Sequence, residues 1–290
     1  MSPSDRMSTF AERGLRDDRD SPASRVETRS RLPLSAYFDE GFTLESPSGD
    51  HVLRIRSLLQ TDFKLFVPGD QDPASSGLYI PRFRLYFEGH VTRPIQYELS
   101  LQRSLDGVFD LLDGNVNFRL SEGINLKFGR FLVPYSYAWY DHLEQYFIAP
   151  ERGLYPLNFG LARQAGLMLW GNLLDDRVQY AVAGTSGHLS GVADNNYTRE
   201  ATGYLNVRPF GGGEEGSLLR YFNIGGSIAG GQTTRPGMPL PLRTSVQASE
   251  NDEGVEGASA VFLVYNEGTA ALGSRFQGAV HLAWYYKQWS

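Results

Sequence analysis

The chain has 290 residues, of which 41% are hydrophobic and 21% charged, with a formal net charge of −6 and no cysteine. The lack of cysteine excludes disulfide frameworks, thiolate metal sites and cysteine nucleophiles, and the negative charge argues against a general nucleic-acid binder. No run approaches the ~18 apolar residues of a transmembrane helix, which excludes a helical membrane protein.

Residues 1–35 are polar and rich in arginine and aspartate, and we expect them to be disordered. They contain no apolar segment typical of a secretory signal peptide. If the rest of the chain lies in an outer membrane, we expect that a signal peptide has been lost or that the start is misplaced.

The first long segment, residues 51–66, alternates between apolar odd positions, such as Leu59 and Phe63, and polar or charged even positions, such as Arg54 and Arg56. Successive side chains of a strand point to opposite faces, so the segment predicts a strand with one apolar and one charged face. Strands of soluble sheets have about 5–6 residues, whereas a membrane-spanning strand needs ~9–11. This segment is long enough to span a membrane.

The same alternation recurs in residues 78–91, 95–102, 112–118 and 124–128. In the first of these, Tyr79 and Phe83 are predicted on the apolar face and Arg82 and Arg84 on the polar face; in the third, Leu112 is predicted on the apolar face. A soluble β-sandwich could produce the same alternation with its apolar face inward. Segment length and aromatic residues near the segment ends favour a transmembrane barrel.

Residues 131–164 interrupt this rhythm, with a short helix predicted at 139–147. A structured loop of this length in an all-β chain is usually functional. Further strands are predicted at 166–171, 177–183, 201–208, 218–230, 259–266 and 276–289, about eleven in all. Short turns alternate with longer loops, as in outer-membrane barrels, so the fold class predicted is an all-β, antiparallel transmembrane β-barrel.

Several stretches carry a family resemblance: Gly41-Phe42-Thr43-Leu44-Glu45-Ser46, Pro81-Arg82-Phe83-Arg84-Leu85-Tyr86-Phe87-Glu88-Gly89, Leu126-Lys127-Phe128-Gly129-Arg130-Phe131-Leu132-Val133-Pro134-Tyr135 and Gln164-Ala165-Gly166-Leu167-Met168-Leu169-Trp170-Gly171. Their order and spacing resemble those of the phosphate-selective porins (the O/P porin family) of bacterial outer membranes. The resemblance implies a sixteen-stranded, usually trimeric barrel in residues 36–290, narrowed by an inward constriction loop at about 131–164. With about eleven to twelve strands here, we expect the C-terminal strands to be missing.

The resemblance also implies an arginine ladder in the pore and lysines at the constriction, although residues 131–164 contain no lysine. The pore-lining candidates are Arg54, Arg56, Lys64, Arg82, Arg84, Arg119 and Lys127. The constriction-loop candidates are Asp141, Glu144, Arg152 and Arg163. A basic lumen would lower the barrier to anions; alternatively, these charges only pair across strands and keep the interior wet.

The predicted function is an outer-membrane porin, a passive diffusion channel for small anions such as phosphate or other small solutes. The alternative is a β protein that is not a channel, either a plugged outer-membrane receptor or adhesin or a soluble carbohydrate-binding sandwich. No pattern of catalytic residues, metal ligands or cofactor-binding residues stands out, so we do not expect an enzyme. The expected partners are small anionic solutes, outer-membrane lipid and, for a full-length chain, two further copies in a homotrimer, without nucleic acid.

Overall fold

A computed structural model describes residues 33–65, 76–103, 109–141, 152–187, 199–214, 216–237, 239, 241–244 and 261–286. The chain divides into two units, Met1–Pro33 and Leu34–Ser290, and the following description concerns the second. Most of the segment predicted to be disordered, residues 1–32, lies outside the described residues, and the first strand begins at Ser35.

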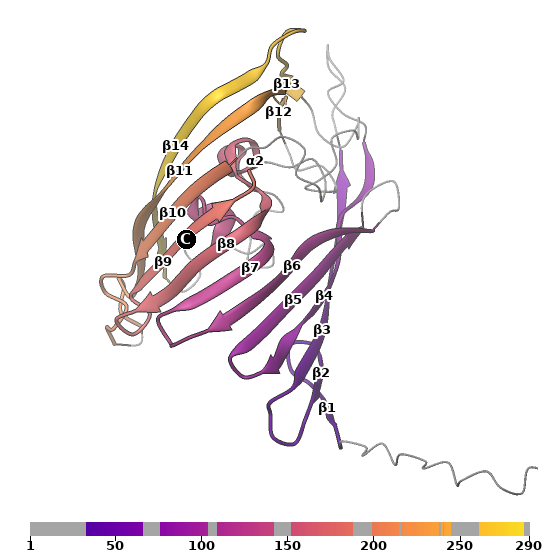
Figure 1. Cartoon of the computed structure of the whole chain (residues 1–290), viewed down its shortest axis with the longest axis vertical. Coiled ribbons are helices and arrows are strands. Elements are labelled where there is room, and N and C mark those ends of the chain that lie inside the picture. The colour runs from indigo at the N-terminus through magenta and orange to yellow at the C-terminus, as the bar shows by residue number, and fades with distance from the viewer. Residues whose placement is uncertain are drawn as a thin grey trace, which may run out of the picture. The chain divides into compact units, whose positions relative to one another are not determined.

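The described part of the second unit is dominated by one twelve-stranded antiparallel sheet, which is strongly curved (Figure 1). Its strands, in sheet order, are β1 (Ser35–Phe38), β2 (Phe42–Glu45), β3 (Val52–Lys64), β4 (Gly77–Thr92), β5 (Ile95–Arg103), β6 (Phe109–Arg119), β7 (Asn125–Leu132), β8 (Arg163–Leu173), β9 (Val178–Thr185), β10 (Arg199–Val207), β11 (Tyr221–Gly237) and β14 (Ala271–Tyr285). Sheet neighbours are consecutive strands except for β11 and β14, which gives the up-and-down topology of membrane barrels. The fold class predicted from the sequence is therefore confirmed.

Several strands are far longer than those of soluble sheets. β3 has 13 residues, β4 has 16 and β14 has 15, all above the ~9–11 that a membrane-spanning strand needs. The long strand predicted at 51–66 is confirmed by β3.

Two predicted elements differ from the structure, and one helix was not predicted. Residues 259–266 do not add a strand to the large sheet, because β13 (Val261–Leu263) pairs with β12 (Leu242–Arg243) in a separate two-stranded sheet. The helix predicted at 139–147 begins earlier, as α1 (Tyr137–Tyr140), and residues 142–150 lie outside the described residues. A second short helix, α2 (Leu154–Phe159), follows before β8.

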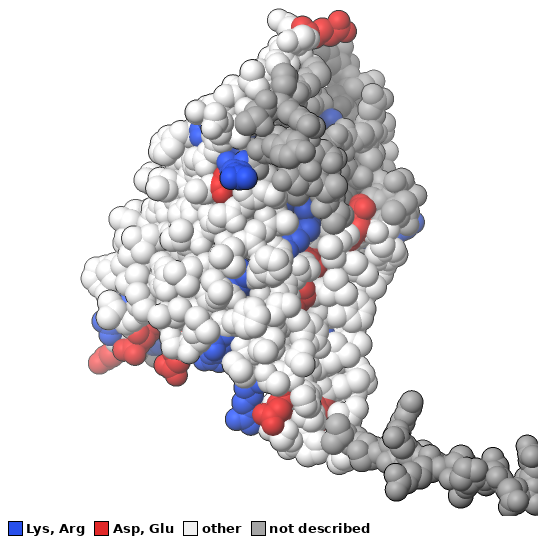
Figure 2. Space-filling model, in the orientation of Figure 1, with Lys and Arg blue, Asp and Glu red and all other residues white. Residues whose placement is uncertain are grey.

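The two faces of the sheet have opposite chemistry, and the polar one is buried. Large apolar side chains such as Phe63 and Val280 are 74% and 92% exposed, whereas Arg84 and Gln164 are 1% and 0% exposed. A soluble sandwich buries its apolar face, so this arrangement contradicts the sandwich alternative and matches a barrel with lipid outside and water inside. Figure 2 shows few charged side chains over β8 to β10 and a gathering of them near the short turns that end these strands. None of the described helices is long and apolar enough to cross a membrane.

Two β-bulges change the predicted faces locally. The register of β3 and β4 shifts between Gln60 and Asp62, so Tyr79 pairs with Asp62 and lies on the polar face, where the sequence placed it on the apolar one. A second shift, in the pairing of β5 with β6, leaves Leu112 fully buried. A bulge inserts one extra residue, and one residue is enough to invert the alternation beyond it.

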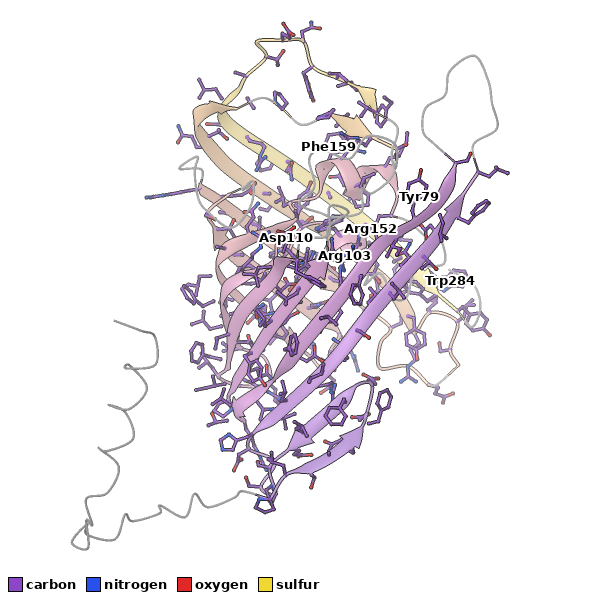
Figure 3. All side chains as sticks on the ribbon, turned by 90° about the vertical axis from the view of Figure 1, so that its right-hand side faces the viewer. Tyr79, Arg103, Asp110, Arg152, Phe159 and Trp284 are labelled. Carbon is purple, nitrogen blue, oxygen red and sulfur yellow. The ribbon has the colours of Figure 1, made fainter. Side chains whose placement is uncertain are left out.

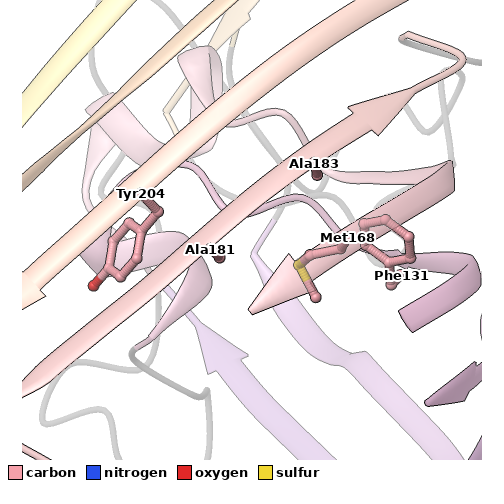
Figure 4. Close-up of a cluster of buried hydrophobic side chains, with 5 residues drawn as sticks. All are labelled: Phe131, Met168, Ala181, Ala183 and Tyr204. Carbon is pink, nitrogen blue, oxygen red and sulfur yellow. The ribbon is translucent and has the colours of Figure 1, made fainter. Parts of the chain in front are cut away.

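A small apolar cluster lies on the otherwise polar face, beneath α1. Phe131, Met168, Ala181, Ala183 and Tyr204 pack together from β7 to β10 (Figure 4). Three aromatic side chains, Tyr137, Tyr140 and Trp170, pack against it. This cluster gives the segment between β7 and β8 an apolar surface to dock on inside the sheet.

Candidate functional site

The inner, polar face of the sheet is the candidate functional site, and its charged side chains begin on β3 and β4. Arg54 and Glu88 are register partners, and Glu88 also receives a hydrogen bond from Arg56 Nη2 at 2.8 Å. Arg54 Nη1 lies 3.9 Å from Glu88 Oε1, and its Nη2 lies 3.3 Å from Asp39 Oδ2. The positive charges of Arg54 and Arg56 are therefore largely balanced by carboxylates.

Arg82 and Arg84 occupy the same face of β4 further from the β4–β5 turn, and both are buried. Arg82 Nη1 donates to the side-chain oxygen of Gln60, and Arg84 Nε donates to that of Gln102, each at 2.5 Å. The acceptor in both bonds is a side-chain amide oxygen, which orients the guanidinium. Within the predicted arginine ladder, Arg82 and Arg84 are thus held in position by amide side chains.

The remaining pore-lining candidates are placed differently. Lys127 Nζ lies 3.9 Å from Glu98 Oε2 and 5.9 Å from the ring centre of Trp170. Arg119 is exposed at the end of β6, next to the β6–β7 turn. Lys64 ends β3, and its side chain lies outside the described part of the chain.

The segment between β7 and β8 lies against the inner face of the last strands of the sheet. Ser136 donates its backbone N–H to Ser227 Oγ of β11 at 2.9 Å. The ring of Tyr137 stacks on His281 of β14 at 4.7 Å between centres, and its hydroxyl donates to Tyr285 at 3.2 Å. Burial, reinforced by that hydrogen bond, raises the pKa of Tyr137 above its ordinary value, so the phenol stays protonated and neutral. Figure 3 marks Arg152 and Phe159 of the same segment.

Of the constriction-loop candidates, Asp141 serves to anchor α1. Its carboxylate accepts hydrogen bonds from Tyr204 at 3.1 Å, Asn206 at 3.3 Å and Gln179 at 3.4 Å. Three donors from β9 and β10 hold one carboxylate, which ties the end of α1 to the wall.

The other constriction candidates contact different partners. Arg152 lies over the ring of Trp139 at 4.5 Å and donates to the carbonyl oxygen of Ala138. Arg163 Nε donates to both oxygens of Asp113, at 3.0 and 2.9 Å. Glu144 lies outside the described residues. The structure therefore does not bring the three described candidates, Asp141, Arg152 and Arg163, into one group.

An inner-face network in the later strands was missed from the sequence. The carboxylate of Glu200 on β10 accepts a hydrogen bond from Gln164 at 2.9 Å and forms an ion pair with Arg275 of β14. The signal was present, because Arg275 alternates with the exposed Phe276 as in the early strands.

Chemically, the inner face offers fixed charges of both signs among many neutral amides and aromatic rings. Among the residues that the structure describes, no three His, Asp or Glu side chains gather as metal ligands would. Such a surface can solvate and orient a polar solute along a path without binding it covalently.

The comparison with protein families gives one match. The family model described as phosphate-selective porin O and P matches residues 53–211, which is more than half of the chain. The match begins in β3 and extends past β10, so it includes the two helices and most strands of the sheet. No curated protein matches the chain.

Proposed function

The chain belongs to the phosphate-selective porin O and P family, and from this premise we propose that it is a passive diffusion channel for small anions such as phosphate in the bacterial outer membrane. The inverted sheet is the observation that carries the proposal. A buried face of arginine, asparagine and glutamine opposite an exposed face of phenylalanine and valine suits water on one side and lipid on the other.

The preference for anions rests on Arg82 and Arg84. Both are buried on the inner face of β4, where they are 2% and 1% exposed. Fixed positive charge on a pore wall lowers the barrier to anions. We therefore assign the anion-selective part of the wall to β4 around these two residues.

The segment between β7 and β8 supports a narrowed pore. It is tied to β11 and β14 through Ser136 and Tyr137, so it occupies space on the inner face. In the proposal this segment is the constriction loop of the barrel that residues 36–290 form. The protein assembles as a homotrimer and carries no enzymatic activity, as a passive channel of this family.

The test is the reversal potential of the refolded protein in a planar lipid bilayer under a gradient of potassium chloride. We expect the double variant Arg82→Gln, Arg84→Gln to shift the reversal potential toward cation preference, because two positive charges leave the wall. The matched control is Arg93→Gln, which removes a positive charge from the exposed β4–β5 turn and should shift it far less. An unchanged preference in the double variant would contradict the assignment of the anion-selective wall.

A further inference from the structure

A cavity of about 530 Å³ opens on the inner face between β1 and β8, away from Arg82 and Arg84. Ligand pockets typically enclose ~300–1,000 Å³. The side chains that line the cavity include five charged ones and one aromatic ring, those of Arg54, Lys127, Glu45, Glu88, Glu98 and Trp170. Six different strands supply them, so the cavity depends on the assembled sheet.

The charge of the cavity does not suit an anion. Two cationic side chains, Arg54 and Lys127, face three carboxylates, those of Glu45, Glu88 and Glu98. A phosphate ion entering the cavity would therefore meet more negative than positive charge at close range. A simple cation would in turn meet the positive charges of Arg54 and Lys127 at close range. Because charges of both signs line the cavity and nearly balance, it suits a polar solute without net charge.

The spacing of these charges suits hydroxyl groups. Arg54 Nη1 lies 3.9 Å from Glu88 Oε1, and Lys127 Nζ lies 3.9 Å from Glu98 Oε2. Both separations exceed the ~2.7–3.2 Å of a direct hydrogen bond. A hydroxyl group can accept one hydrogen bond and donate another at the same time, so one hydroxyl lying beside each pair can bridge it. The cavity holds two such pairs.

An aromatic ring completes the site. Trp170 Nε1 donates to Asn117 Oδ1 at 2.9 Å, and this bond fixes the orientation of the indole in the wall. Asn117 and Trp170 both line the cavity. The face of an aromatic ring packs well on the apolar face of a ring-shaped solute whose edge carries polar groups. Because the indole is already held in place, binding costs less side-chain entropy.

We propose that this cavity binds a neutral, polyhydroxylated ring solute such as a hexose. The hydroxyl groups of the solute bridge Arg54 to Glu88 and Lys127 to Glu98, and its ring packs on Trp170. This site goes beyond the proposed anion channel. Binding of the solute requires the folded sheet but does not require that the protein conducts ions.

The test uses the full chain refolded in detergent micelles, with glucose as the probe in a titration followed by saturation-transfer NMR. We expect saturable glucose binding that neither inorganic phosphate nor glycine betaine displaces at equal concentration. Lys127→Met removes one donor and keeps the length of the side chain, and should weaken binding about tenfold. Arg119→Met removes a positive charge from the same face without lining the cavity, and should leave binding unchanged.

Folding of each variant is checked by its shift in electrophoretic mobility on heating. If Lys127→Met fails to fold, Glu98→Gln keeps the shape of the site and should also weaken glucose binding. Absence of saturable binding, displacement by phosphate or betaine, or equal weakening by Lys127→Met and Arg119→Met would each overturn the proposal. Conductance is measured on the same preparation, so a channel that does not bind glucose refutes this site alone.

Discussion

The buried ion pair between Arg163 and Asp113 predicts a large loss of stability when its cation is removed. Their side chains are 8% and 6% exposed, and Asp113 also accepts a hydrogen bond from Ser100 Oγ at 2.8 Å. Arg163→Gln leaves the carboxylate buried without its cation, which costs about 3–5 kcal/mol in such settings. We expect about 3 kcal/mol, the lower end, because the inner face borders water. The double variant Arg163→Gln, Asp113→Asn should recover much of this loss, since no buried charge remains.

The assay is equilibrium unfolding in urea of the protein refolded into lipid vesicles. The matched control is Arg93→Gln, which breaks the exposed pair of Arg93 with Asp50, 3.3 Å apart and 72% and 48% exposed. Exposed pairs contribute only about 0–1 kcal/mol. If Arg163→Gln changes the free energy of unfolding no more than Arg93→Gln does, burial does not govern these ion pairs and the reasoning fails.

Three further predictions concern the two faces and the strand contacts. Cysteine introduced at Leu59, on the exposed apolar face, should resist a water-soluble thiol reagent in membranes, while cysteine at Gln60 should react; equal labelling would contradict the assignment of faces. Val280→Arg places a charge on the lipid side and should destabilise the protein by about 2–4 kcal/mol in vesicle unfolding, and a neutral result would place Val280 away from lipid. Gly171→Ala puts a Cβ against a backbone carbonyl of the β6–β7 turn and should cost about 1–3 kcal/mol, whereas Gly184→Ala has open space and should cost little; the reverse order in urea unfolding would show that close packing is not the reason.

Strand character and the division into two faces could be predicted from the sequence. The alternation in residues 51–66 identifies β3, and the same reasoning places Arg82 and Arg84 together on the polar face. The reason is local, since side-chain direction in a strand has a period of two residues and needs no knowledge of distant contacts. The family resemblance stated from short stretches is confirmed by the match over residues 53–211.

Departures from the period were decided by strand pairing. Tyr79 and Leu112 changed face because bulges arise between two strands, and a single strand's sequence carries no signal for them. Val261–Leu263 was predicted in the main sheet because its pattern says nothing of its partner, which is β12.

Only the tertiary structure determined which charges meet on the inner face. Arg163 and Asp113 are fifty positions apart in the chain, and Arg275 and Glu200 are seventy-five apart. An arginine that donates to an amide, as Arg84 does to Gln102, and one that donates to a carboxylate, as Arg56 does to Glu88, look alike in the sequence. The sequence by itself determined that polar and apolar side chains lie on opposite faces of the sheet, because alternation is local. Which partner each charged side chain meets depends on the pairing of neighbouring strands, which brings distant residues within a few ångströms.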